Sequence, residues 1–121
     1  MTLRKTLTSI VLAGAISLSG CGYQIPQYQI SQEVFDKIVE EPVKEWVKTS
    51  DNYMNVYQLV REGHYDEAQT VLEGYMRQQI REGAEYKGVI NGTDKVSKTA
   101  AERIGKTIDG QIDKIQTYLK E

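Results

Sequence analysis

The chain has 121 residues, enough for one domain, and its 40% hydrophobic and 26% charged residues are typical of a globular protein. The formal net charge of −2 is too small to indicate a nucleic-acid partner. Cys21 is the only cysteine. An intramolecular disulfide is therefore excluded, and the body must fold on its hydrophobic core alone.

The first 20 residues differ from the rest of the chain. Arg4 and Lys5 precede an apolar, uncharged run over residues 7–18, with small residues after it. This order is typical of a secretory signal peptide, and the run is shorter than the roughly 20 apolar residues of a membrane-spanning helix. A buried core helix fits poorly because the run has no polar face. We therefore expect residues 1–20 to be a cleaved signal peptide.

The sequence LSGC at residues 18–21 resembles the lipobox of bacterial lipoproteins. The resemblance implies that Cys21 becomes the first residue of the mature protein and carries a diacylglycerol on its sulfur, with palmitate-type acyl chains. Two or three acyl chains on one residue form a stable membrane anchor, whereas one chain binds only marginally. Consistent with such an anchor, no long apolar run follows Cys21.

The residue after the cysteine is Gly22. In enteric-type lipoproteins an aspartate there favours the inner membrane, so the resemblance implies the outer membrane, facing the periplasm. Loss of Arg4 and Lys5 leaves 13 basic against 17 acidic residues. A body of that charge is not attracted to anionic lipid, so the lipid on Cys21 must provide the membrane attachment.

Residues 21–32 are rich in Gln and Tyr and contain Pro26, which indicates a flexible lipidated tether; a short strand is the alternative. Residues 33–121 are predicted to form a helical domain. Apolar residues place a short helix over 34–39, with Ser31 as its cap. Pro42 lacks a backbone donor and is predicted to start a second helix, residues 42–62, whose weak point is 49–52.

Gly63 is predicted to end that helix, and the next is expected over residues 64–82, ending at Gly83. Its stripe consists of Ala68, Val71, Leu72, Tyr75, Met76, Gln79 and Ile80. The short connection predicts an antiparallel αα-hairpin.

Residues 83–95 are expected to be a loop, or a β-hairpin around Asn91-Gly92. A last helix is expected over 94–119, where Gly105 and Gly110 either allow close helix contact or only weaken the helix. The predicted fold class is all-α, a small helical bundle built on the central hairpin.

Residues 57–75 resemble the centre of a tetratricopeptide repeat in Gly63, Tyr65, Ala68 and Leu72. The aromatic residue and the Leu-Gly pair that the family carries early in its first helix are missing. No second copy is visible, although stable arrays need about three repeats. A generic αα-hairpin is therefore the favoured interpretation.

Large aromatic residues gather on the two central helices. Tyr and Trp are enriched at protein interfaces, but they also fill the cores of small bundles, and the core is the favoured interpretation. As candidate partner-binding residues we take Trp46, Tyr53, Tyr57, Tyr65 and Tyr75.

No catalytic residue, cofactor or metal site is expected. His64 is the only histidine and has no companion ligand at metal spacing. Cys21 is expected to be lipidated, and no serine lies in a nucleophile motif. The acidic residues look like solvated helix faces, without a pair that their spacing singles out.

These features predict a lipoprotein that binds a protein partner in the cell envelope. It would serve as an accessory or assembly factor of a secretion, pilus or conjugation system. The first alternative is a plasmid or phage exclusion or immunity lipoprotein. The alternative from another class is a cell-wall enzyme or ligand carrier.

Overall fold

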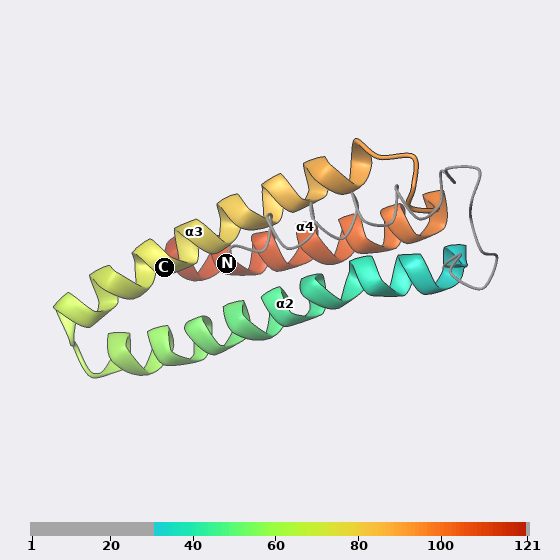
Figure 1. The fold of residues 1–121 in the computed structure, drawn as a ribbon. Helices are drawn as coiled ribbons and strands as arrows, with labels where there is room; N and C mark the ends of the chain where they lie inside the picture. Colours follow the sequence, from blue (N-terminus) through green and yellow to red (C-terminus); the bar gives the residue numbers. More distant parts are fainter. Residues whose placement is uncertain (1–30, 121) are drawn as a thin grey trace.

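The computed structural model describes residues 31–120, which form three α-helices and, within that range, no strand (Figure 1). The helices are α2 (Gln32–Glu62), α3 (Asp66–Asn91) and α4 (Lys98–Lys120). Successive helices run antiparallel, and each helix contacts both others. The all-α bundle and the central hairpin, α2–α3, are confirmed. The signal peptide, Cys21 and the tether up to residue 30 lie outside the described residues.

Each helix buries one stripe of residues spaced by three or four, the pattern of left-handed helical bundles. In α2 the stripe is Phe35, Val39, Val43, Trp46, Ser50, Met54 and Tyr57. In α3 it is Met76, Gln79, Gly83, Tyr86 and Ile90, and in α4 it is Ala100, Ile104, Ile108, Gln111 and Ile115. The three stripes face one another and form the core.

A polar layer divides this core into two apolar clusters. The layer contains Ser50, Gln79 and Gln111, one residue from each helix, each no more than 8% exposed. The Nε2 of Gln111 donates to Ser50 Oγ at 2.6 Å and to Oδ1 of Asp51 at 2.8 Å. These bonds hold α4 against α2 at this level of the core. The Oε1 of Gln79 is also buried, but it has no hydrogen-bond partner among the described residues.

The proline in α2 does not separate two helices. Ser31 caps the helix as predicted, its hydroxyl accepting from Val34 N at 3.2 Å. However, the helix continues through Pro42 and through residues 49–52 to Glu62, so the predicted break at Pro42 was wrong. Val39 and Val43, on either side of the proline, are both buried. Burial of this face in the bundle outweighs the loss of one backbone hydrogen bond.

The turn between α2 and α3 begins at Gly63, as predicted. His64 N donates to Arg61 O at 3.2 Å, and Tyr65 N donates to Val60 O at 3.0 Å. This is a Schellman motif, in which the residue after the cap takes a left-handed conformation. That residue is His64, with φ of 60°, rather than Gly63. The ring of Tyr65 packs over Gly63, where an added Cβ would lie 2.5 Å from the ring.

The predicted end of α3 at Gly83 was wrong. The helix continues to Asn91 and is capped by Gly92, so residues 84–91 are neither a loop nor a β-hairpin. The connection to α4 is correspondingly short, and α4 begins at Lys98 rather than near residue 94. Ser97 accepts from Ala100 N at 3.2 Å, which is the hydrogen bond of a helix N-cap.

Candidate partner-binding surface

Two of the five candidate aromatic residues belong to the core. Trp46 is 3% exposed, and its indole Nε1–H donates to the backbone oxygen of Gln79 at 3.1 Å. Tyr57 is 2% exposed and packs with Met54 and Met76. Both lie on the stripe that α2 turns toward the other helices. Both side chains are therefore almost fully covered by the bundle, and their assignment to an exposed binding surface is corrected.

The other three candidates lie at or near the surface of the hairpin. Tyr53 of α2 stacks on Tyr75 of α3, with ring centroids 5.6 Å apart and an interplanar angle of 25°. Tyr53 is half-buried, whereas Tyr75 is 47% exposed. Tyr65 projects from the turn and is 65% exposed. The fold thus brings Tyr53 and Tyr75 together and places Tyr65 at the tip.

Exposed apolar side chains gather around these tyrosines. Among residues 31–120, seven large apolar side chains are exposed, and five of them lie between residues 56 and 75. These five are Val56, Leu59, Tyr65, Val71 and Tyr75. Because exposed apolar patches are a common feature of interaction sites, this region is the candidate surface. We call Tyr53, Val56, Val71 and Tyr75 the outer strip.

Sequence reasoning missed Val56, Leu59 and Val71. The predicted stripe of α3 combined two faces of the helix, because it contained Val71 and Tyr75 together with Leu72 and Met76. A single core stripe is narrower than that set. The exposed face could therefore have been recognised from the sequence, because the predicted stripe was too wide for one buried face. Val71 and Tyr75, which are four residues apart, form a second, exposed face.

Two open grooves lie at opposite ends of the bundle. One, of about 580 Å³, lies where α4 ends beside α2 and is lined by Tyr57, Gln58, Arg61, Glu62, Thr117 and Tyr118. The other, of about 570 Å³, lies between the start of α2 and the α3–α4 connection, and its lining includes Gln32, Ile90, Val96 and Lys98. The lining of the second groove also includes two acids, Asp94 and Glu102, both of them exposed, whereas the lining of the first includes Glu62 alone.

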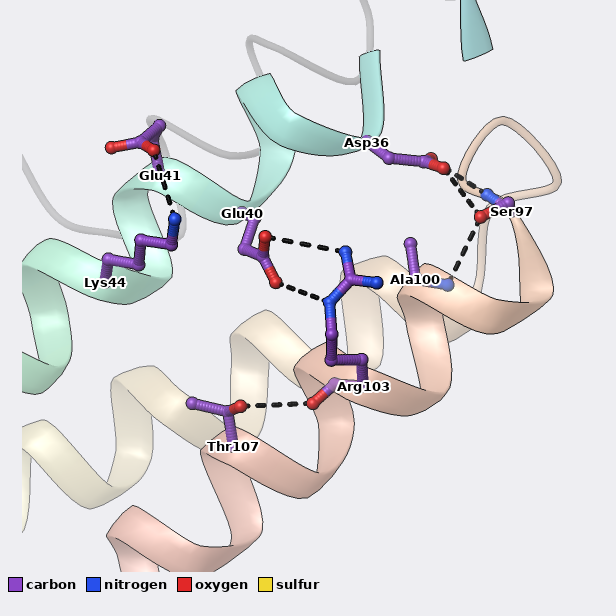
Figure 2. A network of polar contacts seen from close by, with 8 residues as sticks. All are labelled: Asp36, Glu40, Glu41, Lys44, Ser97, Ala100, Arg103 and Thr107. Carbon is purple, nitrogen blue, oxygen red and sulfur yellow. Dashed lines mark hydrogen bonds and ion pairs between the residues drawn. The ribbon is translucent and has the colours of Figure 1, made fainter. Parts of the chain in front are cut away.

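Polar contacts hold α4 against the N-terminal half of α2 (Figure 2). Asp36 accepts from Ser97 Oγ at 2.6 Å and from Ser97 N at 3.0 Å, and Gln32 Nε2 donates to it at 2.9 Å. Burial by itself raises the pKa of Asp36. The hydrogen bonds from Ser97 and Gln32, with the charge of Arg103, outweigh that effect and lower the pKa below its ordinary value of 3.8.

One turn further along α2, Glu40 forms an ion pair with Arg103 of α4. The Nε of Arg103 lies 2.9 Å from Oε2, and Nη2 lies 3.5 Å from Oε1, so both carboxylate oxygens are engaged. Hydrogen bonding and the charge of Glu40 raise the pKa of Arg103. Asp36 and Glu40 of α2 are each paired with a donor, Ser97 or Arg103, at or in α4. This cluster therefore fixes the packing of the two helices.

Other kinds of site find no support among residues 31–120. His64 lies exposed in the turn. No cluster of three or more His, Cys, Asp or Glu in this part of the chain is arranged to hold a metal ion. None of the described helices is both long and apolar enough to cross a membrane.

Comparison of the chain with protein-family models, with curated proteins and with solved structures found no match. The described residues therefore define a class by architecture alone: a three-helix bundle with an exposed apolar surface at the end of its first hairpin. Helices of 31 and 26 residues make this hairpin much longer than a tetratricopeptide unit of about 34 residues.

Proposed function

We propose that this protein is a lipid-anchored component of the bacterial envelope that binds a partner protein through the hairpin end of its bundle. It is held through lipid on Cys21 in the outer membrane and faces the periplasm. It acts as an accessory or assembly factor of an envelope system of the secretion, pilus or conjugation kind.

The distribution of exposed apolar side chains carries this proposal. The described chain begins at one end of the bundle, whereas the turn after α2 lies at the other end (Figure 1). Since α2 has 31 residues at about 1.5 Å each, it separates the two ends by about 46 Å. An anchor before Ser31 would thus leave the outer strip projecting away from the membrane attachment, where a partner can reach it.

The anchor is tested by replacing the cysteine. Cells that express the natural chain and the C21S variant are labelled with palmitate, and inner and outer membranes are then separated. We expect the natural chain to be labelled and to sediment with the outer membrane, and the variant to be unlabelled and released. An unlabelled natural chain, or a variant that stays equally bound to the membrane, would contradict the anchor.

The binding function is tested by crosslinking in cells. A photo-crosslinking amino acid is placed at Val71, on the outer strip, and in a separate strain at Val34, which is 48% exposed at the far end of α2. We expect discrete crosslinked species from position 71 that position 34 does not give. The same products from both positions, or none from position 71, would count against a binding surface on the hairpin.

A further inference from the structure

Asn91 and Gly92 lie where α3 ends, and the proposed function uses neither residue. Asn91 is the last residue of the helix, and Gly92 is its cap. Both residues are exposed to solvent. An asparagine that precedes a glycine can react with the backbone of its own chain, because glycine has no Cβ to keep its nitrogen away from the neighbouring side chain.

The reaction is an intramolecular attack on the side-chain amide. The backbone nitrogen of Gly92 attacks Cγ of Asn91 and forms a five-membered succinimide ring. The bond from Cγ to the side-chain nitrogen breaks, and this nitrogen leaves as ammonia with the proton that Gly92 gives up. Water then adds to one of the two ring carbonyl carbons and opens the ring, which leaves aspartate or isoaspartate at position 91. The conversion requires no enzyme, lipid anchor or partner protein.

The last turn of α3 restrains the attacking nitrogen. The N–H of Gly92 donates to the backbone oxygen of Gly88 at 2.9 Å. While this hydrogen bond persists, the nitrogen is held along the helix axis and cannot turn toward the side chain of Asn91. Deamidation therefore requires the last turn to open, and its rate depends on how often the turn does so.

This turn has several features that favour opening. Gly92 has φ of −83°, so α3 does not end in the left-handed conformation of a Schellman motif. Residues 88–91 contain no Lys or Arg to interact with the helix C-terminus. Gly88 lowers the helix propensity of the turn, although nothing outside that turn lies within 4 Å of the place where its Cβ would be. Of these four residues only Ile90 is fully buried.

We infer that Asn91 is a site of self-modification by deamidation, and that the last turn of α3 controls its rate. Either product places a carboxylate at the C-terminal end of the helix, where the helix dipole disfavours negative charge. Isoaspartate also lengthens the backbone of the connection that leads to Ser97, which donates to Asp36 at 2.6 Å. The modification thus weakens the end of the bundle at which α2 begins.

The chain offers a matched control inside a helix. Asp109 and Gly110 follow Ile108 in the middle of α4, just as Asn91 and Gly92 follow Ile90 at the end of α3. The D109N variant therefore carries Ile-Asn-Gly twice, once at a helix end and once in a helix interior. The ion pair of Asp109 with Lys87 that this variant loses is exposed and therefore weak.

The test incubates the purified full-length D109N variant in detergent and follows both sites by peptide mass spectrometry. We expect position 91 to deamidate about tenfold or more faster than position 109 in the folded chain, because an interior turn opens only with a larger part of its helix. In urea the two sites should react at similar rates. In the folded natural chain, Asn52 and Asn55 should stay unmodified, since both are exposed but lie inside α2 and precede Tyr53 and Val56.

Two glycine variants test the control by the last turn. We expect G88A to slow deamidation of Asn91 about fivefold, because alanine strengthens the turn that must open. G74A is the control: it makes the same change in α3, also with nothing within 4 Å of the added Cβ, but far from the helix end. It should leave the rate unchanged. Circular dichroism shows whether each variant keeps its helices. The N91D variant, which mimics one product, should unfold at a lower urea concentration than the natural chain.

Four results would overturn the inference. Asn91 that stays intact in the folded natural chain, while the urea-unfolded chain converts fully, would show that the fold blocks the reaction. Equal rates at positions 91 and 109 in folded D109N would remove the role of the helix end. Equal rates in G88A and G74A would remove the role of the last turn. An unchanged urea midpoint of N91D would contradict the weakening of the bundle.

Discussion

The indole of Trp46 on α2 lies directly against Gly83 in the middle of α3. A Cβ added at Gly83 would lie 2.6 Å and 2.8 Å from two carbons of the indole ring and 3.3 Å from Ile112. Real Cβ contacts are not that short, and an indole held by a hydrogen bond to Gln79 cannot turn aside. Gly83 therefore permits the close approach of two helices, and it does not end a helix.

The G83A variant should lose stability. Alanine normally stabilises a helix interior by about 1 kcal/mol relative to glycine. At Gly83 we expect the opposite sign, a decrease of about 1–3 kcal/mol in the free energy of unfolding, because the methyl group overpacks the core. Urea denaturation measures the change. The control is G110A, since an added Cβ at Gly110 meets nothing within 4 Å and should stabilise the protein.

Replacement of Pro42 by alanine should stabilise the bundle. Pro42 lies inside a continuous helix, where it cannot donate the backbone hydrogen bond that the carbonyl of Ile38 would accept. Proline in a helix interior is about 3 kcal/mol less favourable than alanine. Loss of the half-buried ring offsets part of this gain, so we expect P42A to raise the free energy of unfolding by about 2 kcal/mol. Unchanged or lower stability on thermal unfolding would show that the proline ring matters more than the missing donor.

Glycine in place of His64 should also stabilise the protein. With a φ of 60°, His64 occupies the position of the Schellman motif that usually holds glycine. The left-handed conformation costs a residue with a Cβ about 1–2 kcal/mol. We expect H64G to raise the free energy of unfolding by about 1 kcal/mol and H64A to leave it nearly unchanged. If both variants had the same stability, the imidazole and not the backbone conformation would determine the effect.

The hydroxyl of Tyr86 should be dispensable for folding. The residue is fully buried, and its hydroxyl has no hydrogen-bond partner among the described residues. Burial also raises the pKa of this phenol, so it stays protonated. We expect Y86F to raise the free energy of unfolding by about 1 kcal/mol, because it removes a buried polar group that is left unsatisfied. The comparison is Y57F, which loses the contact of the Tyr57 hydroxyl with Gln69 at 3.5 Å and should not gain stability.

Acid should weaken the contact between Asp36 and Ser97. Because the pKa of Asp36 is lower in the folded state than its ordinary value of 3.8, this carboxylate stabilises the fold above that pH. The contribution disappears as pH falls through the folded-state pKa. We expect D36N to lower the free energy of unfolding at neutral pH by about 1–2 kcal/mol and to flatten its fall below pH of about 4. The E41Q variant, which alters an exposed ion pair with Lys44, should change little.

Local patterns in the sequence predicted much of the fold. The three- and four-residue spacing of apolar residues identified helices, and Ser31 and Gly63 marked the start and end of α2. These features act within one or two turns, so they can be read without knowledge of the remaining chain. It was harder to predict which of the candidate residues are exposed, because Trp46 and Tyr75 are equally plausible interface residues until their burial is known.

The sequence by itself predicted an all-α bundle over residues 33–121, built on a central antiparallel hairpin. Only the tertiary structure decided that Pro42 and Gly83 lie inside helices, and that Tyr57 is buried while Val71 is exposed. The physical reason is the relative size of two free energies. A helix-breaking residue costs about 1–3 kcal/mol, and burial of a few large apolar side chains against the other two helices exceeds that amount. Such burial depends on residues tens of positions away, as Trp46 and Gly83 show.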